Sequence, residues 1–212
     1  MDSQMREATL EDILRARDRR AEKQKQLIQE YVLPLVSFTI NIPGTIKSSP
    51  LYVKIFEEGL ALLGQRLSTK GVTVVAGEVH YRFTGPEAFI VVNGSESALK
   101  KLVLQLEDSH QLGRIFDFDV LGLDFQSISR ESLGYPQRKC LLCDELARVC
   151  ARSGRHPVDK LREKINSMAQ NYFKHSEDVK PINALYPEIF KYFRDKNSKG
   201  VYPKTNLKEE NL

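Results

Sequence analysis

The feature that most restricts the fold of this chain is the order of strand-like and helix-like apolar patterns between residues 35 and 128. Runs rich in β-branched and aromatic residues predict strands, and apolar residues that recur every three or four positions predict helices. The order β-α-β-β-α-β predicts an α+β fold with a ferredoxin-like core. The expected strands are 35–42, 72–82, 88–92 and 115–121, with another short one at 125–128, and the expected helices are 51–68 and 98–106, the latter capped by Ser95.

Helices are expected on both sides of this core. Thr9, followed by Asp12 three positions later, is typical of a capping box and predicts an N-terminal amphipathic helix over residues 10–32. After residue 130 the chain is basic, and its apolar spacing predicts a helix that begins at Pro157 and a short one within 184–195. We expect one domain over residues 9–195, with the α+β core at 35–130, a C-terminal helical subdomain at 135–195 and a disordered tail at 196–212.

Composition argues against several classes of protein. A net charge of +4 and a pI near 8.9 suit a phosphate-carrying substrate without demanding nucleic acid. No apolar run approaches the roughly 20 residues of a membrane helix, and the N-terminus lacks the apolar segment of a secretory signal. Three cysteines, an odd number, argue against a disulfide framework. We expect a cytoplasmic protein with no membrane and no nucleic-acid partner.

The stretch GRIFDFDVLG, residues 113–122, brings two aspartates into an apolar run. Alternation along a strand places Asp117 and Asp119 on the same face, with their Cβ atoms roughly 6–7 Å apart. Two carboxylates at this distance repel one another unless a cation, an arginine or a proton compensates their charge. The pair therefore either faces water on an exposed sheet surface or forms a site for a divalent metal.

A second group of candidate metal ligands is Cys140-x2-Cys143-x6-Cys150-x5-His156. Three thiols and an imidazole are a ligand set that binds zinc tetrahedrally, although structural zinc sites usually separate their ligand pairs by longer segments. The alternative is that the thiols pack inside a helix, since Cys143 and Cys150 are seven residues apart and would share one face. Both interpretations, a zinc site and packing cysteines, remain open at this point.

Four segments in order resemble the apo-citrate lyase phosphoribosyl-dephospho-CoA transferases, the holo-acyl-carrier-protein synthases of citrate lyase. The resemblance extends from about Leu10 to Leu161 and is carried by LEDILRARDRRAEKQ, PLVSFTINIPGTIKSSPL, HQLGRIFDFDVL and SRESLGYPQRKCLLCDELARVCARSGRHPVDKL. The related enzyme of malonate decarboxylase carries a comparable Asp-x-Asp that follows Gly-Ser. Here Gly113-Arg114 precedes the pair, which favours the citrate lyase branch.

The resemblance implies a nucleotidyltransferase. Its donor would be 2'-(5''-triphosphoribosyl)-3'-dephospho-CoA, its acceptor a serine of the citrate lyase acyl carrier protein (gamma subunit), and its second product diphosphate. A triphosphate donor needs a divalent cation, and aligned carboxylates such as Asp117 and Asp119 are suitable ligands for Mg²⁺. We therefore expect these two aspartates to be catalytic and to hold Mg²⁺.

Several residues in the matching segments are candidates for binding the donor. An arginine can engage two phosphate oxygens at once, and backbone amides with a lysine at the end of the first strand could also meet a phosphate. The candidate substrate-binding residues are Arg130, Arg114, Lys47, Asn41, Arg152 and Arg155. Arg130 has the best individual case, because Ser-Arg lies in a specific segment close to the aspartate strand.

Two other classes of function compete with this prediction. A ferredoxin-like fold with a basic patch is also found in RNA-binding modules, but the strands here carry no aromatic-rich motif for base stacking and the chain has no tryptophan. A non-catalytic assembly factor that clasps the acyl carrier protein is the second alternative. A clasp would not need two aligned carboxylates.

Overall fold

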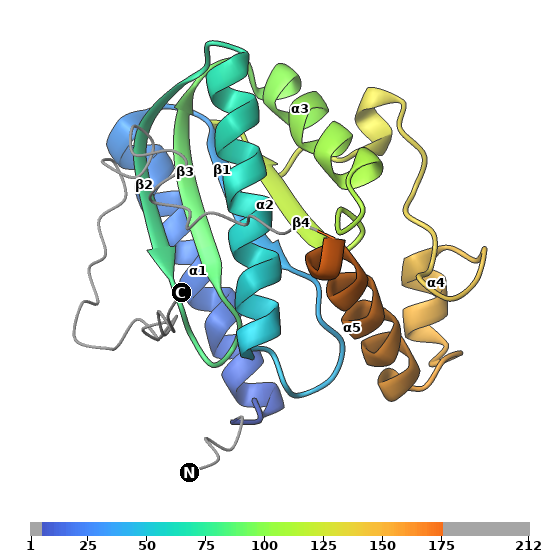
Figure 1. Cartoon of the computed structure of the whole chain (residues 1–212). Helices are drawn as coiled ribbons and strands as arrows, with labels where there is room; N and C mark the ends of the chain where they lie inside the picture. The colour runs from blue at the N-terminus through green and yellow to red at the C-terminus, as the bar shows by residue number, and fades with distance from the viewer. Residues whose placement is uncertain (1–5, 176–212) are drawn as a thin grey trace, which may run out of the picture.

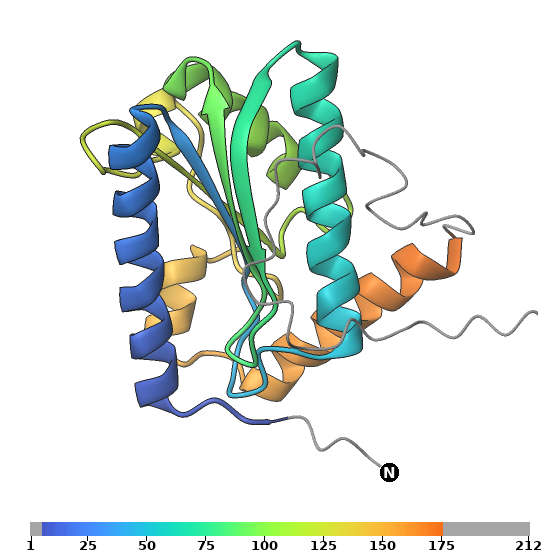
Figure 2. The same ribbon diagram turned by 90° about the vertical axis from the view of Figure 1, so that its left-hand side faces the viewer.

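The computed structural model describes residues 6–175. Helices cover both faces of one sheet, with α1 on one side and α2 on the other (Figure 2). The elements are α1 (Leu10–Tyr31), β1 (Leu35–Ile40), α2 (Pro50–Thr69), β2 (Thr73–His80), β3 (Glu87–Asn93), α3 (Glu96–Ser109), β4 (Phe116–Leu121), the 3-10 helix η1 (Glu131–Leu133), α4 (Ala147–Arg152) and α5 (Val158–His175). The expected α+β class is confirmed. The helix expected within 184–195 and the tail at 196–212 lie outside the described residues.

The four strands form one antiparallel sheet in the order β2-β3-β1-β4 (Figure 1). β1 lies in the interior of the sheet and pairs on one side with β3 and on the other with β4. Its residue Thr39 is opposite Glu87 of β3 and Asp117 of β4. β4, the strand that carries the aspartate pair, is therefore an edge strand.

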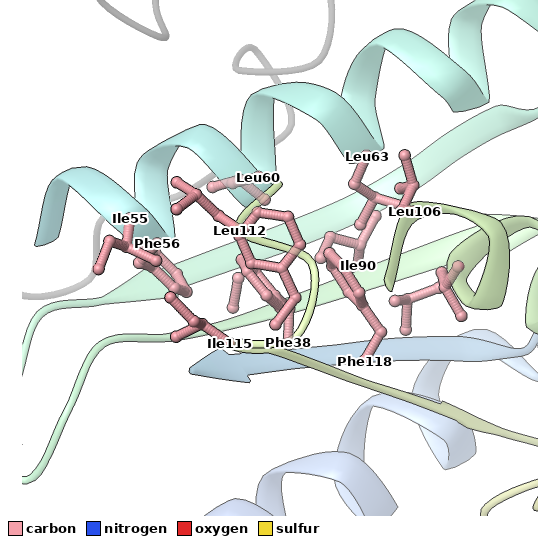
Figure 3. Packing of buried hydrophobic residues seen from close by; sticks show 14 of the residues in the cluster. Phe38, Ile55, Phe56, Leu60, Leu63, Ile90, Leu106, Leu112, Ile115 and Phe118 are labelled. Carbon is pink, nitrogen blue, oxygen red and sulfur yellow. The ribbon is translucent and has the colours of Figure 1, made fainter. Parts of the chain in front are cut away.

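The main hydrophobic core lies between the sheet and the helices α2 and α3. The buried Phe38 ring of β1 stacks on Phe56 of α2, with ring centroids 4.9 Å apart, and on Phe118 of β4 at 4.1 Å (Figure 3). Gly59 of α2 allows this approach, because a Cβ at that position would lie 2.5 Å from Phe38 Cζ. Each such buried aromatic ring contributes about 1.5–3 kcal/mol relative to an exposed one.

The opposite face of the sheet packs against α1 and is partly polar. The predicted capping box is present, since the Thr9 side chain accepts from the Asp12 backbone and the Asp12 carboxylate accepts from the Thr9 backbone. Leu27 and Ile28 of α1 pack on a small apolar cluster of the sheet. Nearer the start of the helix the contacts are polar, and Gln24 donates a hydrogen bond of 2.9 Å to Ser37 of β1.

Two buried charged side chains of α3 cover the free edge of β4. Lys100 Nζ donates to the carbonyl of Phe118 at 3.1 Å, and Glu107 Oε1 accepts from the Phe118 backbone N–H at 3.0 Å. Both side chains are buried. They satisfy the backbone groups that an edge strand leaves unpaired, which a buried sheet edge requires.

One expected strand is absent. Residues 125–128 contribute only an isolated bridge between Ser127 and Leu121, so the prediction of a strand there is wrong. Phe125 has a positive φ of 64°, and the Asp124 carboxylate accepts from the backbone of Gln126, which together form a turn. A side chain that caps the backbone locally competes with strand pairing.

The C-terminal helix α5 returns to the main core. Its residues Ile165 and Ala169 are fully buried within the same hydrophobic cluster as the sheet. The Tyr172 hydroxyl donates to Glu58 of α2 at 2.6 Å. Among the helices that the structure describes, none has both the length and the apolar character required to cross a membrane.

Candidate functional site

Asp117 and Asp119 lie at alternate positions of β4, on the side of the sheet away from α2 and α3. Phe116, Phe118 and Val120 between and beside them are buried in the main core. Asp117 is half-buried and Asp119 is exposed. The strand alternation thus places both carboxylates at one surface beside the sheet edge.

A cavity of about 370 Å³ opens at this surface. It brings Asp117 and Asp119 together with Arg130, which follows β4 by nine residues. The remaining lining residues are Lys100, Leu104, Glu107, Phe118, Ser127, Ile128, Ser129 and Arg138. Three of the residues expected at the site, two acidic and one basic, are therefore neighbours in space.

Two hydroxyl groups contact the carboxylates. Thr39 of β1 lies 3.5 Å from Asp117 Oδ2, and Ser127 donates to Asp119 Oδ1 at 3.0 Å. Burial raises the pKa of Asp117 above its ordinary value, and the negative charge of Asp119 raises it further, while Arg138 opposes both effects. The ionised form of Asp117 is therefore stabilised by any cation that binds beside it.

Arg138 is the site residue that sequence reasoning missed. Its guanidinium lies 2.5 Å from Glu107 Oε1 of α3 and 3.6 Å from Asp117 Oδ1, so it bridges the buried edge of β4 and the aspartate pair. It lies within the matching segment SRESLGYPQRKC, which was the only available signal. A loop arginine has no periodicity that would reveal where its side chain points.

Three guanidinium groups lie near one another, those of Arg130 and Arg138 in the cavity lining and that of Arg114 outside it. Arg130 binds Asp108 at 2.7 Å, and Arg114 donates to the backbone carbonyl of Lys139. The pKa of Arg114 is lowered by burial and by the nearby charges of Arg138 and Arg130. The buried Nε atoms of Arg114 and Arg130 have no hydrogen-bond partner among the described residues. A cluster of guanidinium groups can donate several hydrogen bonds to an anion that carries several oxygens.

Of the six expected binding residues, Arg130 alone lines this cavity. Asn41 is exposed in the loop after β1, and Lys47 in the same loop donates to the Ile42 carbonyl at 2.5 Å. Burial lowers the pKa of Lys47, and the charge of Arg17 lowers it further. Arg152 and Arg155 are exposed, and Arg155 lies 3.9 Å from Glu145.

The four candidate zinc ligands converge. One ligand atom from each of Cys140, Cys143, Cys150 and His156 lies within 4.8 Å of all the others. His156 Nε2 is 3.2 Å from Cys143 Sγ. The alternative of thiols packed inside one helix is wrong, because α4 spans only Ala147–Arg152 and Cys140 and Cys143 precede it. The structure thus contains a Cys3His cluster compatible with a metal ion.

A larger cavity of about 710 Å³ lies between α1 and the strands β2 and β3. Its buried carboxylates are already paired within the fold. Glu87 binds Arg20 at 3.2 Å and Arg82 at 3.1 Å, and Glu78 binds Lys23 at 3.3 Å. We regard the smaller cavity as the functional site, because it combines the aligned carboxylates of Asp117 and Asp119 with the Arg130 Nε–H, which has no hydrogen-bond partner among the described residues.

Comparisons with known proteins agree with the resemblance. Residues 8–172 match the sequence model of the family described as apo-citrate lyase phosphoribosyl-dephospho-CoA transferase. A probable member from Vibrio cholerae serotype O1 (strain M66-2) is 38% identical over 165 residues, 77% of this chain and 93% of the relative. A member from Shigella boydii serotype 18 and one from Escherichia coli (strain SE11) are each 32% identical over 160 residues, 76% of this chain and 87% of each relative.

Proposed function

Because the chain belongs to the apo-citrate lyase phosphoribosyl-dephospho-CoA transferase family, we propose that it is the citrate lyase holo-[acyl-carrier protein] synthase of its organism. It transfers the phosphoribosyl-dephospho-CoA group from 2'-(5''-triphosphoribosyl)-3'-dephospho-CoA to a serine of the citrate lyase acyl carrier protein, the gamma subunit. The serine oxygen forms a bond to the α-phosphorus, the bond from this phosphorus to the bridging oxygen breaks, and diphosphate leaves. The serine proton is lost to the surroundings.

The observation that carries this proposal is the cavity at the edge of β4. It is lined by the carboxylates of Asp117 and Asp119 and by the guanidinium groups of Arg130 and Arg138. A triphosphate brings several negative charges, so its binding requires both a cation at the carboxylates and guanidinium groups on the phosphate oxygens. The larger cavity beside α1 does not contain two carboxylates from alternate positions of one edge strand together with a buried guanidinium Nε–H that has no hydrogen-bond partner among the described residues.

Mg²⁺ is the cation that this oxygen-rich site fits. Asp117 and Asp119 would hold it, with the hydroxyls of Ser127 and Thr39 close by. When bound, Mg²⁺ neutralises charge on the phosphates and thereby makes the α-phosphorus more electrophilic. Arg130 and Arg138 would bind the phosphate oxygens and stabilise the charge that develops on the departing diphosphate.

Further assignments belong to the same proposal. The Cys3His cluster would take Zn²⁺, since soft thiolates with one imidazole favour zinc over Mg²⁺. The element order β1-α2-β2-β3-α3-β4 and the strand order β2-β3-β1-β4 support a ferredoxin-like core, with residues 9–195 as one domain. We place the reaction in the cytoplasm, where the three free thiols stay reduced.

A transfer assay tests the proposal. Purified carrier protein, donor, Mg²⁺ and this chain should yield a carrier whose mass increases by that of the phosphoribosyl-dephospho-CoA group. Asp117→Asn and Asp119→Asn keep the shape but lose the charge that holds Mg²⁺, so each should slow transfer about a hundredfold or more, or about 3 kcal/mol in barrier. Unmodified carrier with the wild-type chain would refute the function. Near-normal turnover in either variant would refute the metal role.

A further inference from the structure

The segment from the start of η1 to the start of α5 contributes Arg138 to the proposed active site but buries very little apolar surface. Within residues 131–157, Cys150 is the only buried residue. Ordering the backbone costs about 1–2 kcal/mol per residue, and a segment of this length normally offsets that cost by apolar burial. Leu141 is partly buried against the main core. This burial is too small to offset the cost of ordering the segment. Another interaction must therefore hold the segment.

The Cys3His cluster lies where such an interaction is needed. Residues 138–147 form a small hairpin, in which Lys139 and Leu146 make an antiparallel bridge. The Cys140 N–H donates to the Glu145 carbonyl at 2.7 Å, and the Ala147 N–H donates to the Arg138 carbonyl at 2.8 Å. Cys140 and Cys143 belong to the hairpin itself. A metal would cross-link them to Cys150 of α4 and to His156, which precedes α5.

The open end of the same hairpin holds the arginine that contacts the aspartate pair. Arg138 is only two residues from Cys140, and its guanidinium lies against Glu107 and Asp117. Lys139, between these two residues, accepts from Arg114 through its backbone carbonyl. Two of the metal ligands, Cys140 and Cys143, thus belong to the same short hairpin as Arg138, and Arg114 is hydrogen-bonded to that hairpin at Lys139.

We propose that the Cys3His cluster is a structural zinc site that positions Arg138 at the proposed phosphate site. Zinc fixes the closed end of the hairpin, and the hairpin in turn fixes the backbone from which Arg138 reaches Asp117. Arg138 is the residue that contacts the donor phosphates, and the four zinc ligands act through it. The phosphate part of this inference rests on the proposed function, whereas the zinc site and the placement of Arg138 against Glu107 do not.

The first test concerns the metal alone. The full chain, purified without chelator or affinity-tag histidines, should contain about one equivalent of zinc. Replacing zinc by Co²⁺ should give the strong visible absorption of a tetrahedral thiolate site. Cys143→Ser should lose the metal, and Arg148→Ala, on the exposed side of α4, should keep it. Absence of zinc in the wild-type protein would overturn the inference.

The second test concerns positioning. In the zinc-loaded protein, the Cys140 and Ala147 amides should resist hydrogen exchange, and the Arg138 side chain should give a distinct N–H resonance that reports its contact with Glu107. Cys143→Ser should lose both signals while amides of the central strand β1 remain protected. If Cys143→Ser loses zinc but retains these signals, zinc does not position Arg138.

A double-mutant cycle separates this inference from the proposed function. With inorganic triphosphate and Mg²⁺ as the probe, Arg138→Ala and Cys143→Ser should each weaken binding roughly tenfold or more, and the double variant should be no weaker than Arg138→Ala alone. If the fold-losses in triphosphate affinity of the two single variants multiply in the double variant, zinc acts independently of Arg138. Failure of transfer to the carrier, with zinc content and the Arg138 signals as expected, would refute the function and leave the zinc site intact.

Discussion

Arg138→Ala should destabilise the protein in a way that depends on pH. The substitution leaves Glu107, which is only 2% exposed, without its charged partner at 2.5 Å. Removing one member of a buried ion pair typically costs about 3–5 kcal/mol. Glu107 keeps its hydrogen bond from the Phe118 N–H and the nearby charge of Lys100. We therefore expect a loss of about 2–3 kcal/mol in the free energy of unfolding above neutral pH.

The direction of the pH effect follows from the pKa of Glu107. Burial raises this pKa above the ordinary value of 4.5, and Arg138 is the largest influence that lowers it. Without Arg138 the folded-state pKa rises further, so the folded protein binds more protons than the unfolded chain over a wider pH range. In that range stability falls as pH rises. The difference between wild type and variant should therefore shrink as the pH is lowered through the raised folded-state pKa of Glu107, because the protonated carboxyl needs no cationic partner in either protein.

Urea denaturation at a series of pH values measures this difference directly. Arg148→Ala is the matched control, because it removes the same charge from an exposed position of α4. The control should change the free energy of unfolding by less than about 0.5 kcal/mol at every pH. A loss in Arg138→Ala that is constant with pH, or equal to that of the control, would refute the proposed pairing of Arg138 with a buried, ionised Glu107.

Two further predictions concern the donor site and the core. Arg130→Ala should weaken donor binding, measured by calorimetry, by about 10-fold to 100-fold. Arg130→Lys should restore only part of this affinity, because an ammonium keeps the charge but not the planar geometry of the guanidinium. Unchanged affinity and transfer would show that Arg130 is not part of the site. Gly59→Ala should lower the free energy of unfolding by about 1–3 kcal/mol, since its Cβ would lie 2.5 Å from Phe38 Cζ and 3.0 Å from Phe116 Cε1. Ser68→Ala, exposed in the same helix, is the control, and equal stability of the two variants would contradict the close packing.

The local elements of this fold could be predicted from the sequence because their signals are local. The capping box at Thr9 appears where the sequence indicates it, and the helix expected at 51–68 is present as α2, which begins at Pro50. Ser95 precedes α3 as expected, but its side chain makes no capping hydrogen bond. Ser95 instead lies 3.1 Å from the Ser97 hydroxyl. The incorrectly predicted strand at 125–128 shows the limit, since the apolar residues Phe125 and Ile128 do not reveal the turn made by Asp124.

The candidate site was only partly predictable, for a similar reason. The shared face of Asp117 and Asp119 follows from strand alternation, and the four zinc-type ligands follow from residue type and spacing. The position of Arg138 depends on how a loop without periodicity returns to the sheet edge. Lys47 and Arg152 had suitable chemistry but lie elsewhere, because charge alone does not specify a place in the fold.

The side chains that cover the edge of β4 also restrict how another protein can meet this enzyme. Lys100 and Glu107 occupy the carbonyl and N–H of Phe118, the hydrogen-bonding groups through which a foreign strand would extend the sheet. Docking by strand addition is therefore blocked beside Asp117 and Asp119. If the proposed site is correct, a carrier protein has to present its serine there through side-chain contacts or a loop. Lys100 and Glu107 also prevent β4 from pairing edge to edge with β4 of another copy of this chain. Replacement of either side chain would expose part of this edge.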